Sequence, residues 1–127
     1  MNLRLDHVHL RCRDLEASRE FYQTMFKGRE AARLEVGGMP IIRMEVGGVV
    51  LALSPPREGE SPGLASEDPG WGCYELGFLV DDVQAAYDEL RALGAVFISG
   101  PREVRPGVQA AFMEAPDGVR IELLHRD

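Results

Sequence analysis

Apolar and polar residues alternate along residues 5–12. The apolar positions are Val8, Leu10 and Cys12, and the polar positions between them are His7, His9 and Arg11. A period of two predicts a β-strand with two chemically different faces. Asp14 then stands where a helix N-cap is expected, and residues 15–26 carry apolar side chains at helical spacing. The chain is therefore predicted to open with a strand followed by a helix.

The same pattern returns 68 residues later. Glu75 stands 68 positions after His7, and Asp82 stands 68 positions after Asp14. Apolar residues at helical spacing follow Asp82, and Gly94 is a natural residue to end that helix. Internal self-similarity of this kind indicates two copies of one structural module.

Each predicted helix leads into three extended segments. They cover approximately 30–36, 40–46 and 49–54 in the first half and 95–99, 108–114 and 119–125 in the second. The last two segments of each half are joined by a turn, Gly47-Gly48 in the first half and Pro-Asp-Gly in the second. Gly118 stands 70 positions after Gly48, so the second half has gained two residues. We expect the loop 100–107 to hold them.

This order of elements predicts a single α+β domain over residues 1–127, built from two tandem βαβββ modules. Module one covers 1–54 and module two covers 73–127. The segment 55–72 between them is rich in proline, glycine and charged residues, which is typical of a linker or surface loop. The length of 127 residues fits one domain of common size.

The charge of the chain narrows the class of partner. A formal net charge of -7 opposes the basic surface that binding to phosphates requires, so we expect no nucleic-acid and no membrane partner. The first ten residues include Arg4 and Asp6 and no long apolar run, which indicates neither a signal peptide nor a membrane span. Cys12 and Cys73 do not have the spacing of metal ligands. We therefore expect a cytoplasmic protein.

The chain resembles the vicinal oxygen chelate superfamily, which includes glyoxalase I, methylmalonyl-CoA epimerase, extradiol dioxygenases, and fosfomycin and bleomycin resistance proteins. Its opening signature runs from Asp6-His7-Val8 through residues 14–16 to Phe21-Tyr22, and its closing signature is residues 115–123, APDGVRIEL. The resemblance covers nearly the whole chain. It implies a glyoxalase-like fold, in which the modules form a concave mixed sheet around a small-molecule cavity. It also implies a homodimer.

The resemblance further implies a metal site at four positions, one on the first and one on the last strand of each module. Here these positions are His7, Ala52, Glu75 and Glu122. Ala52 cannot be a ligand, and Glu75 stands where the family often has histidine. His7, Glu75 and Glu122 would hold a divalent metal and leave a position open for water or substrate. This donor set favours Mn²⁺, Mg²⁺, Ni²⁺ or Zn²⁺, whereas a second imidazole from His9 would suit Fe²⁺.

Three further residues are candidates for binding substrate. His9 and Arg11 share a face of the first strand with His7, and Arg120 shares a face of the last strand with Glu122. Both arginines are suited to holding an anionic group through two hydrogen bonds. We expect them to line the cavity.

Two functions fit these residues. One is a metal-dependent enzyme of the glyoxalase or dioxygenase type, acting on a small substrate with adjacent oxygens, with lyase or isomerase chemistry favoured. Glu75 and Glu122 would be its catalytic carboxyl groups, and Glu75 would move a proton. The other is a metal-free protein that binds and sequesters an antibiotic or metabolite, which the empty ligand position at Ala52 favours. Metal analysis separates the two.

Overall fold

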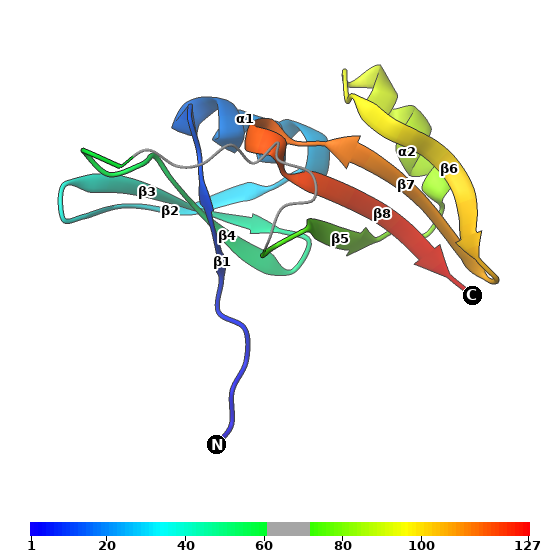
Figure 1. Cartoon of the computed structure of the whole chain (residues 1–127), viewed down its shortest axis with the longest axis horizontal. Coiled ribbons are helices and arrows are strands. Elements are labelled where there is room, and N and C mark those ends of the chain that lie inside the picture. The colour runs from blue at the N-terminus through cyan, green and yellow to red at the C-terminus, as the bar shows by residue number, and fades with distance from the viewer. Residues whose placement is uncertain (61–71) are drawn as a thin grey trace. The chain divides into compact units, whose positions relative to one another are not determined.

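The structure is a computed structural model of the chain, and it describes residues 1–60 and 72–127. The chain forms two compact units, Met1–Gly63 and Leu64–Asp127, called here the first and second units. The described residues of each unit form a four-stranded mixed sheet and one long helix (Figure 1). The predicted α+β fold class with two βαβββ modules is therefore confirmed. Residues 61–71 of the predicted linker lie outside the described residues.

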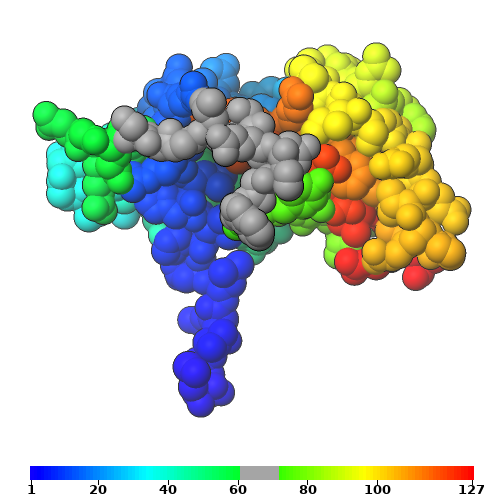
Figure 2. Space-filling view, viewed as in Figure 1, coloured from blue at the N-terminus to red at the C-terminus, as the bar shows by residue number. Residues whose placement is uncertain are grey.

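The first unit contains β1 (Val8–Arg11), α1 (Leu15–Phe26), β2 (Arg29–Val36), β3 (Met39–Val46) and β4 (Val49–Ser54). Its sheet has the strand order β1-β4-β3-β2, with β1 parallel to β4 and the other pairs antiparallel. β1 is shorter than the alternating segment 5–12, because only its four residues pair with β4. The residues before it, dark blue in Figure 2, extend away from the unit.

The second unit repeats this arrangement. It contains β5 (Glu75–Leu79), α2 (Val83–Ala92), β6 (Phe97–Arg105), β7 (Val108–Glu114), a 3-10 turn (Pro116–Gly118) and β8 (Arg120–Arg126). The strand order is β5-β8-β7-β6, with β5 parallel to β8. Neither helix in the described part of the chain has the length and apolar content needed to cross a membrane.

The register of strand pairing also repeats. His9 pairs with Ala52 in the first unit, and Gly77 pairs with Glu122 in the second. Gly77 stands 68 positions after His9, and Glu122 stands 70 positions after Ala52. The alignment of the two halves read from the sequence is therefore present in the sheets.

The segment 100–107 is not the loop that the sequence predicted. β6 continues to Arg105, and its pairing with β7 shifts register along the way. Pro101 is tolerated because β6 is an edge strand, where a missing N–H need not break the ladder. Val108 stands 69 positions after Met39, the first residues of β7 and β3. One additional residue is thus taken up before β7, and the other lies in the turn between β7 and β8.

Both helices begin at the predicted N-cap. The Oδ1 atom of Asp14 accepts a hydrogen bond from the Ala17 amide at 3.0 Å, and Oδ1 of Asp82 accepts one from the Ala85 amide at 3.0 Å. Each cap satisfies a backbone N–H that has no partner inside the helix, which is worth about 1 kcal/mol. The caps fix the point where the chain leaves β1 or β5.

One face of each sheet lies against its helix. In the second unit, the ring of Tyr87 on α2 lies 4.5 Å from that of Phe97, which pairs with Met113. Successive side chains of a strand point to opposite faces, so Phe112 and its partner Glu122 lie on the other face. We call this second surface the helix-free face.

The first unit has the same two faces. Gly28, two residues after the end of α1, lies so close to Met44 and Val46 that an added Cβ would be 3.3 Å and 3.1 Å from their side chains. Arg43 and Ala52, which pair with each other, therefore lie on the helix-free face. Fully buried side chains fill the helix-covered faces: Ile42, Met44, Leu51 and Leu53 in the first unit, and Met113, Ile121 and Leu123 in the second.

Candidate functional site

Two carboxyl groups meet on the helix-free face of the second unit. Glu75 comes from β5 and Glu122 from β8, and the two strands are hydrogen-bonded neighbours. Burial raises the pKa of the Glu122 carboxyl, and a hydrogen bond with Glu75 and the repulsion between their charges raise it further. Glu122 therefore holds a proton more readily than an ordinary glutamate, as a group that donates or accepts protons requires.

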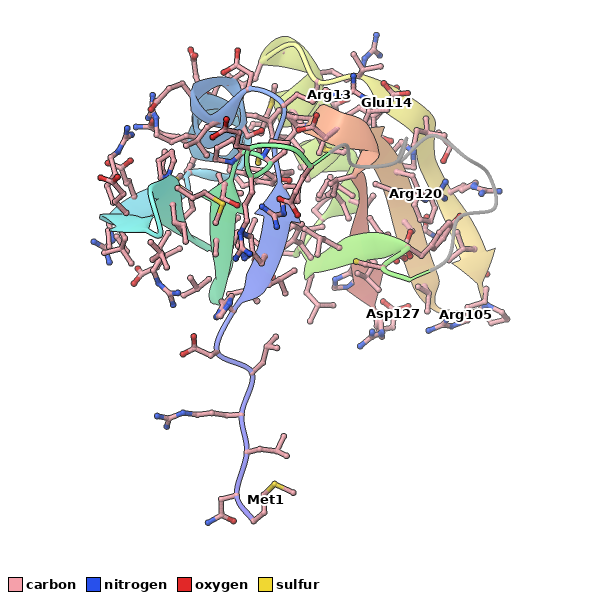
Figure 3. All side chains as sticks on the ribbon, turned by 60° about the vertical axis from the view of Figure 1, so that its left-hand side comes forward. Met1, Arg13, Arg105, Glu114, Arg120 and Asp127 are labelled. Carbon is pink, nitrogen blue, oxygen red and sulfur yellow. The ribbon has the colours of Figure 1, made fainter. Side chains whose placement is uncertain are left out.

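Arg120 holds the other member of this pair. Its Nε donates a hydrogen bond to Oε2 of Glu75 at 3.1 Å, and both side chains are only about one-quarter exposed, 27% and 23%. Its guanidinium also lies 4.2 Å from the ring centroid of Phe112 and 5.2 Å from that of Tyr74. Arg120 is labelled in Figure 3, at the start of β8. The cation orients the Glu75 carboxylate.

Gly77 keeps space beside Glu122. A Cβ added to Gly77 would lie 3.8 Å from Oε2 of Glu122 and 3.7 Å from the Leu124 side chain. These are ordinary contact distances, so a Cβ at this position would already touch the Glu122 carboxyl group, and glycine leaves that space open. Gly77, Phe112 and Tyr74 were not among the site residues predicted from the sequence. Alternation along β5 does place Gly77 on the same face as Glu75, whereas Phe112 is brought to the site only by the pairing of β7 with β8.

His7 lies directly before β1 in the first unit. Its Nδ1 is 2.8 Å from Oδ2 of Asp6, and the same oxygen accepts a hydrogen bond from Arg43 at 3.4 Å. The hydrogen bond with His7, followed by the contact with Arg43, lowers the pKa of the Asp6 carboxyl. An imidazole whose Nδ1 bonds a carboxylate is oriented through that contact, and its Nε2 is the nitrogen suited to a metal.

His9 and Arg11 are engaged within the first unit. Nε2 of His9 is 2.6 Å from Oγ of the fully buried Ser54. Burial lowers the pKa of the His9 imidazole, and the nearby charges of Arg11 and His7 lower it further. Arg11 donates to Sδ of Met39 at 3.4 Å and to the Pro55 carbonyl at 3.1 Å, and it lies 3.3 Å from the carboxylate of Glu60.

The structure thus brings some predicted site residues together. Glu75, Glu122 and Arg120 form one cluster in the second unit, while His7, His9 and Arg11 belong to the first. Among residues 1–60 and 72–127, no group of three or more His, Cys, Asp and Glu side chains is arranged to hold a metal ion. A ligand set of His7, Glu75 and Glu122 draws on both units, and it stays a prediction.

Two known proteins are similar in sequence to this chain over nearly its whole length. It is 30% identical to the uncharacterized protein YwbC of Bacillus subtilis, over 99% of this chain and all of the relative. It is 28% identical to a probable lactoylglutathione lyase of Vibrio cholerae, over 97% of this chain and 91% of the relative.

A solved structure shares the fold. It is a single-residue variant of the fosfomycin resistance protein FosX from Listeria monocytogenes, complexed with Mn(II) and 1S,2S-dihydroxypropylphosphonic acid. The TM-score is 0.71 at 19% identity, over 97% of this chain and 92% of that one. The model of one protein family also matches residues 4–123. The chain therefore belongs to the Glyoxalase/Bleomycin resistance protein/Dioxygenase superfamily.

Proposed function

We propose that this protein is a metal-dependent enzyme that acts on a small substrate with adjacent oxygen atoms, by lyase or isomerase chemistry. The observation that carries the proposal is the carboxyl pair Glu75 and Glu122, where partial burial and mutual repulsion raise the pKa of Glu122. The relative named as a probable lactoylglutathione lyase and the Mn(II) bound to FosX support the same class of function. A homodimer, which the family resemblance implies, and a cytoplasmic location, which the first ten residues and the two cysteines lead us to expect, belong to this proposal.

The donor atoms fit a divalent ion. Two adjacent carboxylates repel each other when both are ionised, and a doubly charged cation between them removes that repulsion. Two carboxylates with one imidazole suit Mn²⁺, Mg²⁺, Ni²⁺ or Zn²⁺, and a second imidazole from His9 would suit Fe²⁺. We propose His7 as that imidazole, since its contact with Asp6 orients the ring. Ala52 contributes no donor atom.

A bound ion would supply a Lewis acid that polarises a substrate carbonyl. The protein groups would then divide the remaining work. Arg120 keeps the Glu75 carboxylate in one orientation, ready to accept a proton at an Oε atom. In the metal-free protein Glu122 retains a proton to a higher pH than an ordinary glutamate, because burial and Glu75 raise its pKa. As a ligand of the ion it would be a carboxylate, and Glu75 would return the proton that it had accepted to the product.

The alternative is a metal-free protein that sequesters a small molecule. Two observations favour it. Ala52 leaves one of the four ligand positions without a donor atom, and the Arg120 cation already neutralises one of the remaining carboxylates at 3.1 Å. The substrate or ligand would then be recognised by the cavity rather than transformed.

Metal binding tests the proposal. We would measure the metal content of protein purified without chelator or affinity tag, and thermal unfolding with and without added Mn²⁺, Ni²⁺ and Zn²⁺. An ion that binds only the folded state should stabilise the parent, by about 2.7 kcal/mol at one hundred times the dissociation constant. Glu122→Gln and His7→Ala should lose most of this increment. Glu103→Gln is the matched control, because Glu103 is an exposed glutamate on β6.

If the parent bound none of these ions at high micromolar concentration, the enzyme proposal would be wrong, and sequestration would replace it. An increment retained in both Glu122→Gln and His7→Ala would place the metal elsewhere.

A further inference from the structure

Arg120 uses few of its hydrogen-bond donors. A guanidinium group carries five N–H donors. Arg33, on the surface of the first unit, uses its Nε and both terminal nitrogens on Glu16 and Glu30. Among residues 1–60 and 72–127, Arg120 donates through Nε alone, to Glu75. Within the described part of the chain, its Nη1 and Nη2 atoms have no hydrogen-bond partner.

The side chain of Arg120 is nevertheless held in place. Phe112, which is 7% exposed, lies 4.2 Å from the guanidinium carbon, and Tyr74 lies 5.2 Å from it. A guanidinium packed against aromatic faces is attracted to their electron density. These contacts, with the bond to Glu75, order a side chain that would otherwise lose much rotamer freedom on binding a ligand.

The N–H donors of Arg120 that do not contact Glu75 lie along one edge of its guanidinium group. Glu75 occupies the side that carries Nε, so the terminal edge carries an N–H of Nη1 and an N–H of Nη2 that point in parallel. This fork matches the two oxygens of a carboxylate or phosphonate. A lysine at this position would present a point charge and no such match.

The charges around Arg120 allow an anion to bind there when a cation is bound to Glu75 and Glu122. Glu75 and Glu122 oppose a negative ligand, whereas Arg105 also acts electrostatically on Glu122. A divalent ion on the two carboxyl groups would remove their opposing charge. The preference for an anion therefore adds a substrate class to the proposed metal-dependent function. It rests on that proposal for the other features of the substrate.

We propose that the Nη1–Nη2 edge of Arg120 binds an oxyanion of the substrate, a carboxylate or a phosphonate, so that the substrate is a small organic acid. The oxyanion lies end-on to the guanidinium, which packs over the rings of Phe112 and Tyr74. Arg120 is therefore a specificity-determining residue as well as the partner of Glu75.

The side-chain Nε–Hε resonances of ¹⁵N-labelled full-length protein test this inference. The protein is titrated at constant ionic strength, once without metal and once with Mg²⁺, with benzoate, with methylphosphonate and with neutral benzamide. The Arg120 resonance is assigned by its absence in Arg120→Lys. It should shift saturably with benzoate or methylphosphonate, and the comparison tells which oxyanion is preferred. Benzamide should leave it unchanged.

Variants then locate the binding. Arg120→Lys should weaken binding of the preferred anion by about tenfold or more, since it removes the forked contact. Arg91→Lys is the matched control and should bind as the parent does. Arg91 also lies over an aromatic ring, at 5.3 Å from that of Tyr87, but it belongs to α2.

An Arg120 resonance that responds to neither anion would overturn the inference, and so would equal anion binding by Arg120→Lys. Because the parent's own resonance is decisive, the result stands even if Arg120→Lys folds poorly. A parent that binds Mn²⁺ but shows no anion response keeps the proposed enzyme and loses the oxyanion site. An anion response without metal binding keeps the oxyanion site and removes the proposed enzyme.

Discussion

The ion pair between Arg120 and Glu75 allows a quantitative test of the site. We would measure the free energy of unfolding of metal-free parent, Arg120→Met, Glu75→Gln and the double variant. The cycle isolates the pairwise interaction, because the loss of ring contacts in Arg120→Met occurs in both arms and cancels.

The structure sets the expected size of the coupling. Exposed ion pairs contribute about 0.2–1 kcal/mol, whereas breaking a fully buried pair costs about 3–5 kcal/mol. Arg120 and Glu75 are 27% and 23% exposed with 3.1 Å between Nε and Oε2, so solvent screens the pair in part. We therefore expect a coupling free energy of about 1–2 kcal/mol near neutral pH.

Urea denaturation followed by circular dichroism would give the four free energies, with equal slopes in denaturant as the condition for comparing them. A coupling below about 0.3 kcal/mol, within the additivity expected of independent sites, would refute an electrostatic link between Arg120 and Glu75. The orienting role given to Arg120 would fall with it.

Two further predictions concern Glu122 and the helix caps. The pKa of Glu122 is higher in the folded protein than its ordinary value of 4.5. Protonated Glu122 therefore stabilises the folded protein fully below pH 4.5, and this stabilisation is lost as the pH rises through the folded pKa. Between about pH 4 and about pH 7, metal-free Glu122→Gln should therefore lose less unfolding free energy than the parent; an identical pH profile would contradict the raised pKa. Asp14→Ala and Asp82→Ala should each lower the free energy of unfolding by about 1 kcal/mol. Asp88→Ala is the control, because Asp88 lies inside α2 and is not its N-cap. No loss in one variant would show that its cap contributes nothing.

The sequence predicted the fold well because its signals were local and repeated. Alternation in β1 and β5, the caps at Asp14 and Asp82 and the glycine turn before β4 each depend on residues close in the chain. The prediction was wrong at residues 100–107, where Pro101 and Gly107 indicated a loop. β6 continues through this segment because it is an edge strand and because its pairing with β7 shifts register. Neither property can be predicted from neighbouring residues in the sequence.

The site was predictable only in part. Alternation and the repeat placed Glu75 and Glu122 on the same face of neighbouring strands, as the register has them. The aromatic contacts of Arg120 could not be foreseen, because Phe112 reaches it from β7 through a pairing set by the whole sheet. The contacts of Arg11 with residues after β4 likewise depend on how that segment returns to the sheet.

A single offset of 70 residues relates the positions of β4 to their counterparts in β8, so a side chain of one strand can be placed at the matching position of the other. β4 and β8 correspond residue for residue, so that Val50 and Ala52 are the counterparts of Arg120 and Glu122. The same backbone geometry therefore carries a cation and an acid in one unit and two apolar side chains in the other. Substitutions in the strands of the first unit could therefore rebuild the acidic centre there, without redesigning a loop.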